Sequence, residues 1–316
     1  MAALVIYEKQ LLDAVGVTQA ALEAVDQSYV WLHEGRATMP PVMHIGVADK
    51  NGDIDVKAAY VDGLSQFAIK IASGFYDNPQ HGLPAGSGLM VLLNSDTGFC
   101  EAVLLDNGYL TDLRTGLGGA VAAKHLAPAD INTVGVLGTG MQARYQVRCL
   151  RLVRDFKHVL IWGRSSVNAE TCAEDLRQLT GLKIAVEDSP EAVVRASQVI
   201  ITVTASREPL LKSDWVGTGT HINAIGADFP GKRELPPELL AMADTLVCDS
   251  FDQCRKLGEL EFLSEKNQQV HELGAVITGT APGRSNNDAI TVCDLTGVGV
   301  QDTAIALAAY RSLQAG

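Results

Sequence analysis

Residues 133–143 read TVGVLGTGMQA, and this stretch decides the fold class. The apolar, β-prone run 134–137 leads into Gly138, which permits a tight turn, and then Gly140, which lets the backbone approach a phosphate. Ala143 is small enough for the next helix to pack closely on the strand, and the first N–H groups of that helix would face a pyrophosphate. The stretch therefore predicts a dinucleotide-binding strand, turn and helix. A strand, turn and helix without a ligand is the alternative.

The end of the next predicted strand indicates which dinucleotide is preferred. An NAD-binding domain places a carboxylate there to receive the ribose 2′-hydroxyl, but this strand ends in WGRSS. A guanidinium pairs bidentately with phosphate oxygens, so Arg164 beside two serine hydroxyls favours the 2′-phosphate of NADP(H). NAD(H) is the alternative, with Arg164 as a solvated loop residue. The predicted cofactor-binding residues, which include two at the ends of later predicted strands, are Gly138, Thr139, Gly140, Met141, Gln142, Arg164, Ser165, Thr204 and Gly226.

Two different patterns divide the chain. Before the fingerprint, short β-prone runs alternate with turn signals such as Asn51-Gly52, which predicts a mainly antiparallel sheet. From residue 133 onward strands and helices alternate, which predicts a doubly wound parallel sheet. The stretch from residue 290 returns to a strand and an amphipathic helix, which we expect to pack on the first part. The prediction is an α/β protein with a Rossmann domain at 128–289 and a second, α+β substrate-binding domain formed by 1–127 together with 290–316.

Composition argues against several classes of function. The 316 residues carry a net charge of −12 without a Lys/Arg run, so we expect no nucleic-acid binding. No apolar run is long enough to span a bilayer, and the N-terminal stretch lacks the basic start and cleavage site of a signal peptide. We therefore expect a cytoplasmic protein without membrane contact. The six cysteines show no metal-ligand spacing, so we expect reduced thiols and neither disulfides nor a metal.

Three charged residues outside the fingerprint are candidates for substrate chemistry. In the predicted strand FAIKIA, alternation places Lys70 on one face between two alanines, either in solvent or on the floor of a carboxylate-binding pocket. Arg114 is expected in the first turn of a helix over 112–126, where the helix dipole also favours an anion. Asp228 follows the predicted strand HINAIG, at the edge where ligands bind in parallel sheets, and an Asx-turn is the alternative role for this residue.

Together with the fingerprint, three stretches resemble the ornithine cyclodeaminase/mu-crystallin family: DNGYLTDLRTGLGGAVAAKHLA, GTHINAIGADFPGKRELPPELL and DLTGVGVQD. The similarity extends over nearly the whole chain and is greatest to bacterial cyclodeaminases of the ectoine-utilisation type and to imine reductases. The resemblance implies a Rossmann domain placed between the two parts of a split first domain. It also implies a homodimer formed through the sheet of that first domain.

The resemblance further implies roles for individual residues. Lys70 and Arg114 would hold the substrate carboxylate, and Asp228 would be the catalytic acid or base. The family's arginine on the early strand falls on His44 in VMHIGV, a departure that bears on the identity of the substrate. The family's acid that contacts the substrate amine falls on Asp55. The catalytic set is thus Asp228, Lys70 and Arg114, and the substrate-binding set is His44, Asp55, Lys70 and Arg114.

Three functions are compatible with the sequence. The preferred one is NAD(P)H-dependent reduction of a small 2-imino acid to an L-amino acid, with a cyclic substrate such as Δ1-pyrroline-2-carboxylate or an acyclic one such as iminosuccinate. The first alternative is ornithine cyclodeamination, in which catalytic NAD+ takes and returns a hydride while L-ornithine gives L-proline and ammonia. The second is a mu-crystallin-type protein that binds NADPH and a small carboxylate. The expected partners are the amino or imino acid and a second copy of the chain.

Overall fold

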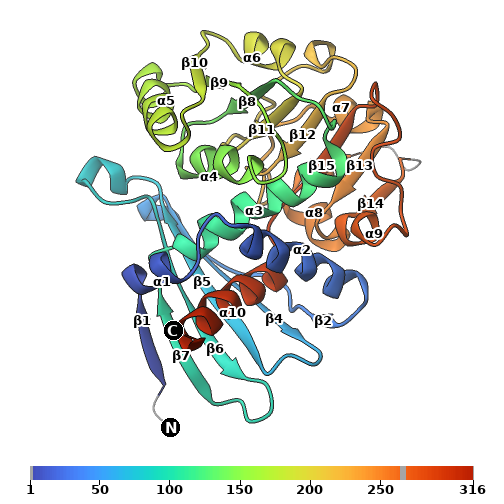
Figure 1. Ribbon diagram of the computed structural model, residues 1–316. Coiled ribbons are helices and arrows are strands. Elements are labelled where there is room, and N and C mark those ends of the chain that lie inside the picture. Colours follow the sequence, from blue (N-terminus) through green and yellow to red (C-terminus); the bar gives the residue numbers. More distant parts are fainter. Residues whose placement is uncertain (1–2, 264–267, 316) are drawn as a thin grey trace. The chain divides into compact units, whose positions relative to one another are not determined.

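The computed structural model describes residues 3–263 and 268–315, and the chain divides into two compact units (Figure 1). One unit comprises Met1–Arg114 and Val298–Gly316, and the other comprises Thr115–Gly297. The first unit is therefore built from both ends of the chain, with the second inserted between them in sequence. The fold is the predicted α/β fold, with one mainly antiparallel and one parallel sheet.

The first unit contains a seven-stranded sheet in the order β1-β7-β6-β5-β4-β2, with β3 paired to β4. All pairs are antiparallel except β1 with β7. The strands are β1 (Leu4–Tyr7), β2 (Ala37–Thr38), β3 (Met43–Val47), β4 (Gly52–Val61), β5 (Gln66–Phe75), β6 (Gly86–Asn94) and β7 (Cys100–Leu105). The helices that lie wholly within this unit are α1 (Glu8–Ala14), α2 (Gln19–His33) and α10 (Gly299–Ala315), with 3₁₀ turns at Ala48–Lys50 and Asn78–His81.

The two faces of this sheet differ in burial. In β5 the predicted alternation is confirmed, because Ala68 and Lys70 are buried on the inner face whereas Ile71 on the outer face is 37% exposed. Helix α10 packs on β4 and β5 (Figure 1). The Thr303 hydroxyl of α10 accepts the N–H of Ala68 and donates to the carbonyl of Ala59, at 3.0 and 2.8 Å. The C-terminal helix is thereby bonded directly to two central strands.

The outer face of the same sheet is apolar. Side chains alternate along each strand, so the residues between those of the inner face form one surface on four neighbouring strands. This surface, called the outer face below, comprises Val56, Ala58, Tyr60, Phe67, Ile69, Ile71, Leu89, Val91, Leu93 and Val103. Two of its members, Tyr60 and Ile71, are each 37% exposed. Contiguous exposed apolar surface of this kind is typical of protein interfaces.

The second unit contains an eight-stranded parallel sheet in the order β10-β9-β8-β11-β12-β15-β13-β14. Its strands are β8 (Thr133–Leu137), β9 (His158–Trp162), β10 (Lys183–Val186), β11 (Val199–Thr202), β12 (His221–Ala224), β13 (Thr245–Cys248), β14 (Val270–Glu272) and β15 (Thr291–Asp294). Its helices are α4 (Met141–Leu150), α5 (Ser166–Thr180), α6 (Pro190–Ala196), α7 (Pro237–Met242), α8 (Phe251–Leu257) and α9 (Leu273–Ile277), with 3₁₀ turns at Ser213–Trp215 and Glu259–Phe262. The order of the first five strands is that of a Rossmann fold. Within the described ranges no helix has both the length and the apolar character needed to cross a membrane.

The return of the chain to the first unit lies later than the sequence predicts. Strand β15 pairs with β12 and β13 in the parallel sheet, so residues 291–294 belong to the second unit and not to the first. Only from Val298 onward does the chain belong to the first unit. The prediction missed this because a fully buried strand such as TVCD has no alternation that would assign it to one sheet or the other.

Helix α3 (Tyr109–Leu126) begins three residues earlier than predicted, and the boundary between the units falls within it. The carboxylate of Asp106 accepts the N–H of Leu110 at 2.8 Å and so caps the start of the helix. Arg114 consequently lies in the second turn and not in the first. The predicted contribution of the helix start to anion binding at Arg114 is therefore wrong.

Candidate functional site

The glycine-rich turn between β8 and α4 has the geometry of a phosphate-binding turn. Gly138 has a φ of +130°, and a Cβ there would lie 2.8 Å from the carbonyl oxygen of Val203. A Cβ at Gly140 would meet nothing within 4 Å, so this side of the turn is open. Ala143 is fully buried, as close packing of the helix on the strand requires. No side chain caps the start of α4, so its N–H groups and the open turn fit a pyrophosphate.

Arg144, which the sequence analysis did not single out, stabilises this turn. Its Nη1 donates to the carbonyl oxygens of Thr139 and Gly140 at 2.8 and 3.0 Å. Its Nε donates to the carboxylate of Asp175 on α5 at 2.8 Å. The guanidinium therefore ties the turn to α5.

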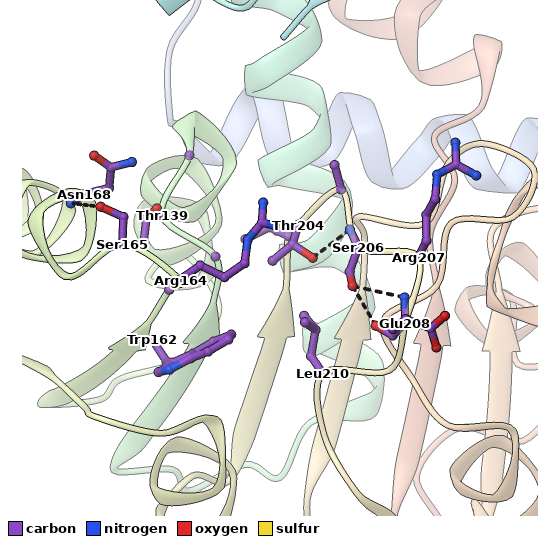
Figure 2. Close-up of a pocket in the computed structure, with 15 residues that line it drawn as sticks. Thr139, Trp162, Arg164, Ser165, Asn168, Thr204, Ser206, Arg207, Glu208 and Leu210 are labelled. Carbon is purple, nitrogen blue, oxygen red and sulfur yellow. Dashed lines mark hydrogen bonds between the residues drawn. The ribbon is translucent and has the colours of Figure 1, made fainter. Parts of the chain in front are cut away.

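A cavity of about 740 Å³ lies beside the turn, at the carboxyl ends of β8, β9 and β11 (Figure 2). Six of the nine predicted cofactor-binding residues line it, namely Gly138, Thr139, Gly140, Arg164, Ser165 and Thr204. The other residues of its lining are Trp162, Gly163, Asn168, Val203, Ala205, Ser206, Arg207, Glu208 and Leu210. The carboxyl edge of a parallel sheet is where dinucleotides bind in Rossmann folds, and the cavity is large enough for part of one.

The other three predicted cofactor-binding residues are not among the residues that the structure places in the cavity lining. Met141 and Gln142 open α4, and Met141 is 56% exposed. Gly226 follows β12, where a Cβ would lie 2.1 Å from the carbonyl oxygen of Thr204. Gly226 therefore allows two loops to approach closely, which is a structural role.

Two arginines of the cavity make no hydrogen bond or ion pair with another described residue. Arg164 follows β9 and is directed towards the loop that carries Thr204, whereas Arg207 comes from the loop after β11 (Figure 2). The Ser165 hydroxyl accepts the N–H of Asn168 at 3.3 Å and so caps α5. Two exposed guanidinium groups in one cavity favour a ligand with phosphate groups.

Glu234 ties a cavity loop to the end of β12. The residue is fully buried, and its carboxylate accepts the N–H groups of Thr204 and Gly226 at 2.6 and 2.9 Å. Burial raises the pKa of Glu234 to about 7, although these hydrogen bonds favour the ionised form. The N–H of Glu234 is in turn bound by Glu259, a second buried carboxyl whose pKa burial raises well above its ordinary value.

The structure offers no candidate metal site within the described residues. Among them, no group of three or more His, Cys, Asp or Glu side chains is arranged to hold a metal ion.

Asp228 lies on the loop after β12, in the unit of the parallel sheet, as predicted from its position after a strand. Its Oδ1 accepts a hydrogen bond from Nζ of Lys232 at 2.8 Å. The Asp228 side chain is 47% exposed and that of Lys232 is 13% exposed. The same loop is fastened to the cavity lining, because the N–H of Arg233 donates to the carbonyl of Ser206 at 2.9 Å.

Lys70 and Arg114 come together in the unit of the antiparallel sheet, around a carboxylate that the sequence analysis did not identify. Asp302, near the start of α10, is fully buried. Its Oδ2 lies 3.1 Å from Nζ of Lys70, and its Oδ1 lies 2.9 Å from Nε of Arg114. The Lys70 and Arg114 side chains are only 2% and 6% exposed. Two cations contact this one carboxylate and a third, Lys57, is buried nearby, so a ligand carboxylate would balance positive charge that Asp302 does not.

The charges of this cluster set the protonation of its members. Burial chiefly, and then the positive charge of Arg114, lower the pKa of Lys70 to about 7, while Asp302 acts in the opposite direction. Lys57, opposite Lys70 on β4, lowers it further. Burial alone would raise the pKa of Asp302, but attraction by these cations outweighs it and the pKa lies below its ordinary value. Asp302 is therefore ionised at neutral pH, where Lys70 titrates.

His44 and Asp55 are direct partners on β3 and β4. The register of the two strands pairs them, and Nδ1 of His44 lies 2.7 Å from Oδ1 of Asp55. Their side chains are 30% and 24% exposed. Asp55 and Lys57 alternate along β4 onto the face that also carries Lys70. The predicted substrate-binding residues on β3, β4 and β5 thus share one face of the sheet.

Sequence reasoning missed several residues that hold the predicted ones in place. Asp302 carried the clearest signal, since it is the one acid among the apolar residues of the stretch DTAIALAAY. Lys232 and Glu234 stand close after Asp228, in GADFPGKREL, but a polar loop gives no periodicity from which their partners could be deduced. Arg207 lines the cavity and Arg144 bonds to the glycine-rich turn, and both positions depend on how the chain folds and not on a local sequence pattern.

Comparison with known proteins identifies relatives along the whole chain. The model of the Ornithine cyclodeaminase/mu-crystallin family matches residues 7–316. An uncharacterized cyclodeaminase of Sinorhizobium fredii is 44% identical over 305 residues, which cover 95% of this chain and 90% of that protein. The iminosuccinate reductase of Paracoccus denitrificans is 31% identical, with 96% and 95% covered. The ornithine cyclodeaminase of Brucella suis is 34% identical over 238 residues, which cover 75% of this chain and 65% of that protein.

Solved structures with the same fold include two that hold a nicotinamide dinucleotide. A dimeric archaeal alanine dehydrogenase with bound NAD has a TM-score of 0.91 at 32% identity, covering 100% of this chain and 97% of that one. The Δ1-pyrroline-2-carboxylate reductase of Thermococcus litoralis, with NADH and L-proline, has a TM-score of 0.93 at 28% identity, covering 99% and 98%.

Proposed function

The chain belongs to the ornithine cyclodeaminase/mu-crystallin family, and we propose that it reduces a small 2-imino acid to an L-amino acid with a reduced nicotinamide cofactor. The family contains imine reductases as well as ornithine cyclodeaminases. Candidate substrates are the cyclic Δ1-pyrroline-2-carboxylate and the acyclic iminosuccinate. Both carry a carboxylate next to the imine carbon, which is the group that the site must hold.

The convergence of Lys70 and Arg114 on Asp302 carries this proposal. Lys57, Lys70 and Arg114 are all buried and all act on Asp302, and burial raises the pKa of Asp106, the other buried acid that interacts with Lys70. The cluster therefore favours a ligand that brings a negative charge. Nη2 of Arg114 makes no hydrogen bond with another described residue, which leaves donors for a carboxylate. In the proposed reaction Lys70 and Arg114 hold the substrate carboxylate and so fix the orientation of C2.

The cavity beside the glycine-rich turn is proposed as the cofactor site. Its open turn, its uncapped helix start and its two arginines fit a dinucleotide, which when bound supplies a hydride. We propose NADP(H) as the preferred cofactor, because Arg164 and Ser165 stand where an NAD-binding domain has a carboxylate. NAD(H), which the two structural relatives bind, is the alternative.

Asp228 is proposed as the catalytic residue that lies beside the substrate nitrogen and stabilises its positive charge. An imine becomes reactive towards hydride as its nitrogen gains a proton, and a nearby carboxylate stabilises the resulting positive charge. The pairing with Lys232 gives Asp228 a fixed partner on its own loop. His44 and Asp55 are proposed to contact the rest of the substrate, where the change from the family's arginine to His44 alters specificity.

We also propose that the protein acts as a cytoplasmic homodimer that is joined through the outer face. The apolar character of that face and the dimeric state of the archaeal relative support this assembly. A stable dimer needs about 800 Å² of buried surface from each partner, and the face extends over four long strands.

The proposed function is tested by the loss of nicotinamide absorbance when NADPH or NADH is mixed with the protein and either imine. Δ1-pyrroline-2-carboxylate is added directly, and iminosuccinate is generated in the cuvette. Stoichiometric oxidation with formation of L-proline or L-aspartate supports the proposal. A cofactor that stays reduced with both imines rejects reduction of these substrates.

Ornithine cyclodeamination is the second candidate, because one relative at 34% identity is an ornithine cyclodeaminase. That reaction needs only catalytic NAD+ and shows no net change in absorbance. Release of ammonia and L-proline from L-ornithine identifies it. If neither reaction occurs while NADPH still binds, the result favours a mu-crystallin-type binding protein.

A further inference from the structure

The carboxylate of Asp302 connects the C-terminal helix to both cations of the proposed carboxylate site. Oδ2 faces Lys70 on β5 at 3.1 Å, and Oδ1 accepts Nε of Arg114 on α3 at 2.9 Å. The residue is fully buried, and it comes from a part of the sequence far from both partners. A buried carboxylate with two cations and no solvent has its orientation set by those two partners.

The neighbouring Gln301 extends this arrangement. Its Oε1 accepts the N–H of Val298 at 3.0 Å and lies 3.5 Å from Nη1 of Arg114. Its Nε2 donates to the hydroxyl of Tyr29 on α2 at 2.9 Å. Arg114 is thus contacted on two of its nitrogens by consecutive residues of α10, which restricts the plane of its guanidinium.

Without Asp302, the two cations would not stay in this arrangement. Lys70 and Arg114 repel each other, and both are buried where repulsion is poorly screened. Asp302 offsets that repulsion and favours the protonated form of Lys70. A site whose donors are already oriented binds a carboxylate without first having to order them.

We propose that Asp302 is a positioning residue of the carboxylate site, which holds Lys70 and Arg114 as a preformed pair of donors for the substrate carboxylate. Asp302 does not itself touch the substrate and acts through the two cations. This inference rests on the proposed function, since it takes the ligand of Lys70 and Arg114 to be a carboxylate.

The test compares Asp302→Asn with Thr303→Val in the full-length protein. Asn retains the shape of the side chain but removes the charge. Thr303, next in sequence and also fully buried, bonds to Ala68 and Ala59 and not to either cation, so its replacement controls for damage to α10. Steady-state constants are measured for the imine and for the cofactor, and thermal unfolding is measured for both variants.

A positioning role predicts that Asp302→Asn raises the KM for the imine about tenfold to a hundredfold, with the cofactor KM unchanged. The alkaline limb of kcat/KM shifts to lower pH, because Lys70 loses the attraction that favours its charged form. Thr303→Val lowers the unfolding temperature but leaves both KM values and the pH profile at wild-type values. The proposal is overturned if folded Asp302→Asn has an unchanged KM for the imine, or if its KM values for the imine and the cofactor rise by the same factor.

Two further measurements keep the test decisive. If Asp302→Asn does not fold, Asp302→Glu is measured in its place. This variant retains the charge but moves it by one methylene, so it should raise the imine KM several-fold, and an unchanged KM overturns the proposal.

Pyrrole-2-carboxylate, a planar carboxylate that cannot be reduced, separates this inference from the proposed function. If wild type binds it by calorimetry without reducing either imine, only the reductase function fails, and weaker binding to the Asp302 variant still supports positioning. No binding to the wild type rejects the carboxylate site and this inference with it.

Discussion

Nζ of Lys232 lies 2.8 Å from Oδ1 of Asp228, across a short loop that also carries Pro230 and Gly231. The hydrogen bond from Lys232 fixes one of the two carboxylate oxygens of Asp228. A carboxylate attracts a positively charged group of a ligand. In the proposed reaction that group is the iminium nitrogen.

Replacing Asp228 by Asn is therefore expected to reduce turnover by about 10²–10³-fold, the usual loss when one group that stabilises charge in the transition state is removed. NADPH affinity, measured by fluorescence titration, should stay at the wild-type value because Asp228 is not among the residues that line the described cavity. Lys232→Gln is the matched variant; it keeps the carboxylate and should lose less turnover. Wild-type turnover in Asp228→Asn would remove this residue from the mechanism.

The binding of a carboxylate should depend on pH through Lys70. Its pKa in the free protein is about 7, chiefly because of burial, and only the protonated form attracts an anion. Binding is therefore strongest below pH 7 and weakens by up to about tenfold per pH unit above it. Calorimetry with pyrrole-2-carboxylate at several pH values, in two buffers of different ionisation enthalpy, measures this affinity and the uptake of a proton. Lys70→Arg, which stays charged, should bind without the alkaline decline; a decline that persists in this variant would assign the titration to another group.

Much of the fold could be predicted from local patterns, because the glycine-rich turn, the alternation in β5 and the strand–helix rhythm are properties of short segments. Alternation alone grouped Lys70 with its alanine neighbours on one face, but it left open whether that face lies in solvent or is buried. What the sequence did not reveal is long-range. Asp302 meets Lys70 and Arg114 only when α10 packs on β4 and β5, and β15 joins the parallel sheet only through its neighbours β12 and β13. The start of α3 was misplaced because its cap, Asp106, lies before the segment in which helical periodicity begins.

Two glycines assigned to the cofactor site should respond differently to Ala. Gly226→Ala places a Cβ 2.1 Å from the Thr204 carbonyl, so it should destabilise the fold by about 1–3 kcal/mol or more. Gly140→Ala meets open space at a φ of −78°, so its cost to stability should stay below about 1 kcal/mol. The new methyl group of Gly140→Ala would instead stand where the cofactor phosphates approach, and the NADPH KM should rise tenfold or more. Chemical unfolding and steady-state kinetics separate the two effects, and an unchanged NADPH KM in Gly140→Ala would contradict the placement of the pyrophosphate.

Arg164 should determine the preference for NADPH. Removing its guanidinium in Arg164→Ala eliminates charge-assisted hydrogen bonds to the 2′-phosphate, so the NADPH KM should rise about tenfold to a hundredfold. The NADH KM should change by less than about threefold, since NADH has no phosphate at that position. Arg207→Ala is the matched variant from the other side of the cavity, and it should affect the two cofactors equally. If Arg164→Ala raises the KM values for NADPH and NADH by the same factor, Arg164 does not discriminate between the two cofactors.

The outer face should hold the dimer together. Ile69 lies on β5 within that face, and Ile69→Asp would place a charge in the proposed interface at a cost that the dimer cannot offset. Light scattering coupled to gel filtration should find a dimer for the wild type and a monomer for this variant. Leu179→Asp, at an exposed position of α5, is the control and should leave the mass unchanged. A dimeric Ile69→Asp variant would place the interface elsewhere.

The most direct test of the proposed chemistry follows the hydrogen that is transferred. NADPH that carries deuterium on C4 of the nicotinamide is incubated with the protein and Δ1-pyrroline-2-carboxylate or iminosuccinate, and the product is examined by mass spectrometry and NMR. Hydride transfer predicts an L-amino acid with one deuterium at C2 when the transferred position is labelled. Two results would contradict the assignment of this protein as a reductase of these imino acids. One is a product that contains no deuterium whichever face of the nicotinamide carries the label. The other is the absence of a product from either imine.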